Sequence, residues 1–72
     1  IIFPNPANEE LNLITDVAPD ELRITSMLGQ LMIDERPLSR TSSVDVSQWP
    51  KGTYIVQMSF GTETVHRKVI IH

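Results

Sequence analysis

The most informative stretch of the sequence is Gly52-Thr53-Tyr54-Ile55-Val56-Gln57-Met58-Ser59-Phe60, in which apolar and polar side chains alternate. Residues two apart in a strand share a face, and this pattern is typical of a strand with one side on a core. The apolar face comprises Tyr54, Val56, Met58 and Phe60, and Ile55 alone departs from the alternation. Pro50, Lys51 and Gly52 end any element upstream, and Gly61 turns the chain afterwards. We expect residues 52–60 to form the central strand.

Shorter strand patterns occur on both sides of this stretch. Leu22 and Ile24 alternate with charged residues, and Gly29 tolerates the positive φ of a tight turn, so residues 21–25 and 31–35 should pair as an antiparallel hairpin. Residues 37–43 are polar and are expected to form a loop. The remaining strand patterns cover residues 1–3, 11–15, 44–46 and 63–72. About seven short strands, with no sustained helical period, predict an all-β fold, a small antiparallel β-sandwich.

The last of these segments does not alternate cleanly. Val65, Val69 and Ile71 share a face, but Arg67 falls on that face too, and Ile70 lies opposite. A bulge near Arg67 would restore the pattern, and so would an edge strand that uses both faces in part. Both arrangements are compatible with the sequence.

Composition limits the range of functions. The chain has 72 residues, no cysteine and a net charge of −3, so a small apolar core worth roughly 3 to 5 kcal/mol must hold it together. Lysine and arginine show no basic patch, which argues against nucleic acid as a partner. No apolar run exceeds three residues, so we expect no membrane span. The start of the chain also lacks the pattern of a secretory signal peptide.

Residues that could carry chemistry do not form a recognisable site. His66 and His72 are six residues apart, which in a strand separates them by roughly 20 Å, too far to share a metal. Asp45 with Ser43 or Ser47 and a histidine could be drawn as a triad, but the sequence has no nucleophile elbow and no oxyanion loop. So thin a core should also leave no room for a pocket. We therefore expect no metal, no cofactor and no enzymatic activity.

Trp49 permits two interpretations. An exposed indole could stack on a sugar, which would make the chain an Ig-like adhesion or carbohydrate-binding module. A ring beside a Pro-Lys-Gly turn is more typical of a lid on the end of a sandwich core. The lid interpretation predicts a partly buried Trp49.

Several landmarks occur in a characteristic order along the whole chain. They are Pro4-Asn5-Pro6, Leu11-Asn12-Leu13, Leu28-Gly29-Gln30, Trp49-Pro50-Lys51-Gly52-Thr53-Tyr54 and Lys68-Val69-Ile70-Ile71. In this order the sequence resembles the C-terminal sorting domain of the type IX (Por) secretion system, type A, found on cargo proteins of Bacteroidota. It departs from a common form of that family by ending in His72 instead of lysine or arginine.

The resemblance implies an Ig-like β-sandwich and one sorting domain over residues 1–72. The implied partners are an N-terminal cargo domain, the outer-membrane translocon and its shuttle protein. The resemblance also implies a sortase-like cysteine protease. In the family this protease commonly removes the sorting domain and joins the cargo to an anionic lipopolysaccharide, and the expected cleavage position lies upstream of Ile1. The cargo would cross the periplasm to the outer membrane, the cell surface or the extracellular space.

The family motifs fall on named positions of this chain. They are Pro4, Asn5, Pro6, Leu28, Gly29, Gly52, Tyr54, Lys68, Val69, Ile70 and Ile71. We hypothesise that the final strand, residues 65–71, together with the turn at residues 52–54, forms the surface that the secretion machinery reads.

Overall fold

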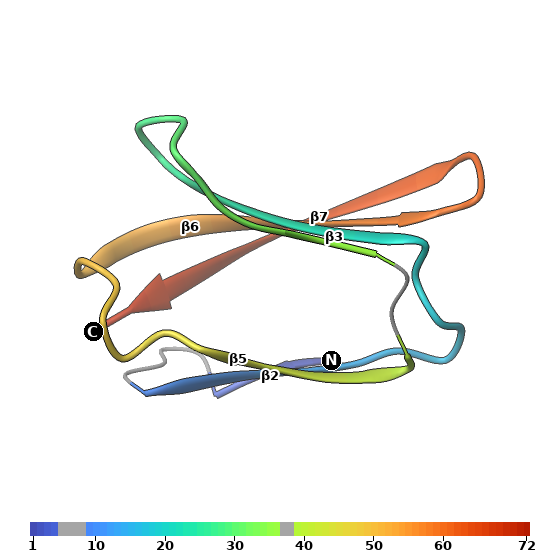
Figure 1. The fold of residues 1–72 in the computed structure, drawn as a ribbon, viewed down its shortest axis with the longest axis horizontal. Coiled ribbons are helices and arrows are strands. Elements are labelled where there is room, and N and C mark those ends of the chain that lie inside the picture. Colours follow the sequence, from blue (N-terminus) through green and yellow to red (C-terminus); the bar gives the residue numbers. More distant parts are fainter. Residues whose placement is uncertain (5–8, 37–38) are drawn as a thin grey trace.

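The protein consists of two antiparallel sheets that face each other (Figure 1). The computed structural model describes residues 1–4, 9–36 and 39–72, so Asn5, Pro6, Pro37 and Leu38 lie outside the described residues. One sheet has the order β1-β2-β5 and the other β4-β3-β6-β7. The strands are β1 (Ile2–Phe3), β2 (Glu10–Ile14), β3 (Glu21–Ser26), β4 (Leu31–Glu35), β5 (Thr41–Asp45), β6 (Gly52–Phe60) and β7 (Glu63–Ile71).

This strand order confirms the predicted all-β sandwich. The chain crosses between the sheets after β2, after β4 and after β5, which is the arrangement of an Ig-like fold. In the described part of the chain, no helix is long and apolar enough to cross a membrane.

Strand β6 occupies the centre of the larger sheet, as its sequence predicts. It pairs with β3 on one side and with β7 on the other. Tyr54, Val56 and Met58 are buried, and Phe60 packs partly buried against the core. The smaller sheet and the connection after it contribute the opposing core residues, Leu11, Leu13, Val44 and Val46. The core is therefore formed between β6 with its neighbours and the β2–β5 pair.

The structure decides between the two arrangements left open for the last strand. The pairing of β6 with β7 runs without interruption from Gly52 opposite Ile71 to Phe60 opposite Glu63, so β7 has no bulge. It is the edge strand of its sheet. Arg67 faces the inner side but remains exposed, and its Nη1 donates a hydrogen bond to the carbonyl of His66 at 2.9 Å.

Two expectations were wrong. Residues 37–43 are not all loop, because β5 already begins at Thr41 and ends at Asp45, before Val46. Its polar residues join the sheet because the ladder with β2 is made by the backbone, which does not require apolar side chains. Val46 is fully buried just after the strand, and its N–H donates to the carbonyl of Glu9 at 2.8 Å.

The expectation that so thin a core leaves no room for a pocket was also wrong. A groove of about 760 Å³ lies between the β1 edge of the smaller sheet and the inner face of β7. Its lining is mainly apolar and includes Ile2, Ile14, Phe60 and Val65, with Arg67 among the charged residues. Three strands do not fully cover four, so the inner face of β7 is left open here, and a charged side chain is tolerated on it.

Candidate recognition site

The family-motif residues form four groups along the chain. Strand register brings three of these groups to one end of the larger sheet: Leu28 with Gly29, Gly52 with Tyr54, and residues 68–71. Ser26, the last residue of β3, lies opposite Tyr54 of β6, and Tyr54 lies opposite Val69 of β7. Gly52 lies opposite Ile71. Figure 1 shows the β3–β4 turn, the start of β6 and the C-terminus at the left of the molecule. We call this region, made of residues 26–30, 50–54 and 68–72 with Pro4, the motif end.

Pro4 belongs to the motif end because of how the smaller sheet is paired. It follows β1 through a cis peptide bond, and since Phe3 lies opposite Asn12, Pro4 lies toward the start of β2. The start of β2 is in turn bonded to the β5–β6 connection through Glu9 and Val46. Asn5 and Pro6 of the same motif lie outside the described residues.

The β3–β4 turn displays an apolar side chain on a fixed backbone. Gly29 has φ of +89°, a conformation that side chains with a Cβ rarely adopt. Its N–H donates to the carbonyl of Ser26 at 2.9 Å, and the N–H of Gln30 donates to Ser26 Oγ at 3.1 Å. Leu28, which precedes the glycine, is 98% exposed. The leucine is therefore held out into solvent by a turn whose own hydrogen bonds are satisfied.

Tyr54 stabilises the connection that leads from β5 into β6. Its hydroxyl donates to the carbonyl of Pro50 at 2.5 Å, which is the tyrosine corner of Ig-like folds. The ring centroid of Trp49 lies 5.3 Å from that of Tyr54, at an interplanar angle of 44°. Trp49 is partly buried against the core, as the lid interpretation predicted. Gly52, with φ of +152°, allows the chain to enter the strand beside this corner.

The terminal motif is divided between the two faces of β7. Val69 and Ile71 are each 1% exposed and belong to the core. Lys68 is exposed on the opposite face, and Ile70 beside it is 45% exposed. Only half of this motif is therefore available to a partner while the domain is folded.

Comparison with known protein families identifies the arrangement. The family model described as "secretion system C-terminal sorting domain" matches residues 1–72. The chain belongs to this family. No curated protein sequence matches it. Membership makes the chain a C-terminal sorting signal for type IX secretion, which implies contact with the type IX machinery, an N-terminal cargo, and export to the outer membrane, the cell surface or the extracellular space. Such a domain is a signal on a cargo and not a catalytic unit.

The structure of the sorting domain separates motif residues that support the fold from those that could touch a partner. Tyr54, Val69 and Ile71 are buried, and Gly52 serves the corner. Pro4, Leu28, Lys68 and Ile70 are exposed. Three apolar residues at or beside the motif end, Met27, Leu31 and Ile55, are not among the family-motif residues. Among them only Ile55 had a signal in the sequence, because it departs from the alternation of its strand.

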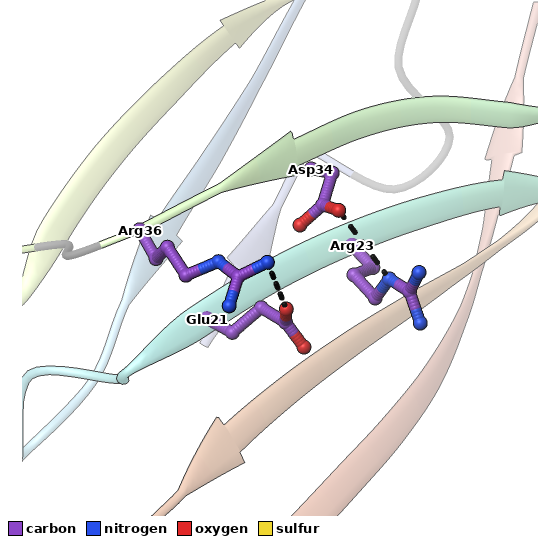
Figure 2. Close-up of polar contacts among 4 residues, drawn as sticks. All are labelled: Glu21, Arg23, Asp34 and Arg36. Carbon is purple, nitrogen blue, oxygen red and sulfur yellow. Dashed lines mark ion pairs between the residues drawn. The ribbon is translucent and has the colours of Figure 1, made fainter.

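Charge on the sorting domain is concentrated away from the motif end of the larger sheet. Arg23 Nε lies 3.8 Å from Asp34 Oδ2, and Arg36 Nη2 lies 3.4 Å from Glu21 Oε2, at the start of β3 and the end of β4 (Figure 2). These side chains are partly solvated, so each pair stabilises the fold little. They nevertheless leave the far end of the sheet polar and the motif end comparatively apolar.

The connection before the tyrosine corner is shaped by a carboxylate. Ser47 donates hydrogen bonds from its side chain and from its backbone to Asp45, and these hold the pKa of Asp45 below its ordinary value. The backbone bond reaches Asp45 Oδ1 at 2.9 Å. This is the local turn that aspartate favours two residues before its partner. Among the described residues of the sorting domain, no group of three or more histidine, cysteine, aspartate or glutamate side chains is placed to hold a metal.

Replacing Tyr54 by phenylalanine should destabilise the sorting domain by about 0.5–1.5 kcal/mol, because the bond to the Pro50 carbonyl is lost while the ring remains. Urea unfolding followed by tryptophan fluorescence measures the change. Thr53→Val, on the outward face of the same strand, is the control and should shift stability by no more than about 0.5 kcal/mol. Equal stability of Tyr54→Phe and the unaltered domain would show that the hydroxyl does not fasten the corner.

Proposed function

We propose that residues 1–72 act as one folded tag that the type IX machinery reads at the motif end. The tag would pass through the periplasm with its cargo and be presented there to the outer-membrane translocon and its shuttle protein. The observation that carries this proposal is the convergence of the motifs. Residues far apart in the sequence, Leu28, Gly52 and Ile70, are brought to one end of the sandwich by strand register.

A folded tag also explains why only some motif residues are exposed. Buried members such as Val69 and Ile71 keep β7 in the sheet, and their exposed neighbours Lys68 and Ile70 are thereby held in fixed positions. We therefore restrict the hypothesis about β7 and the turn at residues 52–54: the secretion machinery would contact only their outward side chains.

Removal of the tag by a sortase-like cysteine protease, upstream of Ile1, is the second part of the proposal. Ile1 is 81% exposed at the edge of the smaller sheet, where its backbone nitrogen donates to the carbonyl of Ile14 at 2.6 Å. A peptide joined to Ile1 would therefore leave the domain at its surface, where a protease could reach it.

A reporter fusion tests both parts. Residues 1–72 are attached to the C-terminus of a periplasmic fluorescent protein in a host that has the type IX system. We expect fluorescence at the cell surface or in the medium, a host lacking the translocon to retain it in the periplasm, and the exported product to be shorter by about 8.2 kDa. Retention in both hosts would refute the sorting role, whereas export at full length would refute only the cleavage.

A further inference from the structure

The exposed large apolar side chains of the described residues form two groups. One group, Ile1, Phe3, Ile14 and Val17, lies at the β1–β2 edge and the connection after it. The other consists of Met27, Leu28, Leu31 and Ile70, with exposures of 59%, 98%, 48% and 45%. Met27, Leu28 and Ile70 lie at the motif end, and Leu31 is the residue that directly follows its segment 26–30.

Strand register places Leu31 and Ile70 of the second group in one row across the outer face of the larger sheet, with Thr25 and Ile55 between them. Leu31 lies opposite Thr25, Thr25 opposite Ile55, and Ile55 opposite Lys68. Directly opposite residues have Cβ atoms about 4.5–5.5 Å apart, and diagonal neighbours are within reach of long side chains. Ile70, two residues after Lys68, is such a diagonal neighbour of Ile55. We call Leu31, Ile55 and Ile70, with Met27 and Leu28 at the turn, the apolar strip.

No residue of the apolar strip belongs to the hydrophobic core. Leu31, Ile55 and Ile70 lie on the face of the sheet opposite to the core, and Leu28 at 98% exposure buries almost nothing. Leu31 and Ile70 keep nearly half of their surface in contact with water. Exposed apolar residues that are contiguous, rather than scattered, mark interaction surfaces.

Charge around the strip indicates the chemistry of what covers it. The exposed lysines Lys51 and Lys68 lie at its border. The carboxylates of the larger sheet lie at the opposite ends of its strands, and they are Glu21, Asp34, Glu35 and Glu63. A complementary partner therefore has an apolar hollow with carboxylates at its rim.

We propose that the apolar strip is the surface that docks the sorting domain on a protein of the type IX machinery, with Leu28 as the central anchor and Lys51 and Lys68 facing acidic side chains of that protein. This rests on the proposed function and adds to it the face used and the chemistry of the partner. The hydrogen-bonded turn at Gly29 favours the anchor role, because the backbone that carries Leu28 is already fixed and loses little freedom on binding.

The test uses the reporter fusion with single substitutions. Leu28→Ser and Ile70→Thr should each reduce exported fluorescence about tenfold, since removing a buried apolar anchor typically has that effect on affinity. The matched controls lie in the other exposed group. Val17→Ser (65% exposed) and Ile14→Thr (41% exposed) should export as the unaltered fusion does.

A second pair of variants tests the charge. Lys68→Glu places an acid on the outer face of β7 and should lower export. Arg67→Glu makes the same change one residue away, on the opposite face, and should not. Thermal unfolding of the purified domains verifies that each variant folds. If Ile70→Thr does not fold, the export of Leu28→Ser and Lys68→Glu tests the docking surface.

Normal export of Leu28→Ser together with Lys68→Glu would overturn the inference and leave the sorting role intact. An equal loss in Val17→Ser and Ile14→Thr would overturn it too, because the effect would not belong to this face. If sedimentation showed that the apolar strip joins two copies of the domain, the assignment of the strip to a protein of the type IX machinery would be refuted. Failure of the unaltered fusion to reach the surface would refute the sorting role itself, and this inference with it.

Discussion

A chain that lacks residues 68–72 should not fold. Val69 and Ile71, each 1% exposed, leave the core with this deletion, and β6 loses its partner from Gly52 to Ile55. Truncating one buried aliphatic side chain typically costs about 2–5 kcal/mol, so removing two approaches or exceeds the roughly 3 to 5 kcal/mol that so small a core supplies. Far-ultraviolet circular dichroism should show loss of the sheet signal, and heating should give no cooperative transition.

The matched control for this deletion is removal of His72 alone. His72 is exposed and follows the last residue of β7, so its loss should leave the melting temperature nearly unchanged. A cooperative transition in the longer deletion, near that of the intact domain, would contradict the role assigned to Val69 and Ile71. If the deletion unfolds the domain, its effect on secretion reports folding, and recognition has to be studied through outward side chains such as Leu28.

The strands could be predicted from the sequence because alternation reports directly on burial. Leu22 and Ile24 were expected to face inward on one strand and are fully buried, and Tyr54 and Val56, expected to face inward on another, are buried as well. Gly29 was expected to close a hairpin and does so with a positive φ. In each case the local pattern and the tertiary environment agree, so one strand at a time was enough.

Features that depend on the opposite sheet could not be predicted in this way. Whether Arg67 required a bulge was decided by the smaller sheet, which leaves the inner face of β7 open at that point and forms a groove there. The start of β5 was missed because its polar residues are held by backbone pairing with β2. Neither property is written in the side-chain pattern of the segment concerned.

The candidate site was predictable as a set of residues but not as a place. Motif order indicated that Leu28, Gly52 and Lys68 matter, yet only the β3–β6–β7 register shows that they share one end of the sheet. From the sequence alone, Tyr54 and Ile70 were equally candidates for recognition, because both are family-motif residues. The structure assigns the first to a corner hydrogen bond and leaves the second on the surface.

Ile24→Ala should destabilise the domain by about 2–5 kcal/mol, the range for removing a buried aliphatic side chain. Ile24 is fully buried in β3, opposite Ile33 of β4 and Val56 of β6, so neighbours on both sides restrict how far the cavity can collapse. Against a total of roughly 3 to 5 kcal/mol, a large part of the population should be unfolded at room temperature. The midpoint of urea unfolding measures the change.

Ile14→Ala provides the comparison, because the same side chain is removed from a strand position that is 41% exposed. Its midpoint should fall much less, since less area is returned to water and no enclosed cavity forms. Equal shifts in the two variants would contradict the placement of Ile24 in an enclosed core. In the reporter fusion, Ile24→Ala should lower export by unfolding the tag, whereas Leu28→Ser should lower it while the purified domain still melts normally, so the two variants together separate the requirement for a fold from the requirement for a surface.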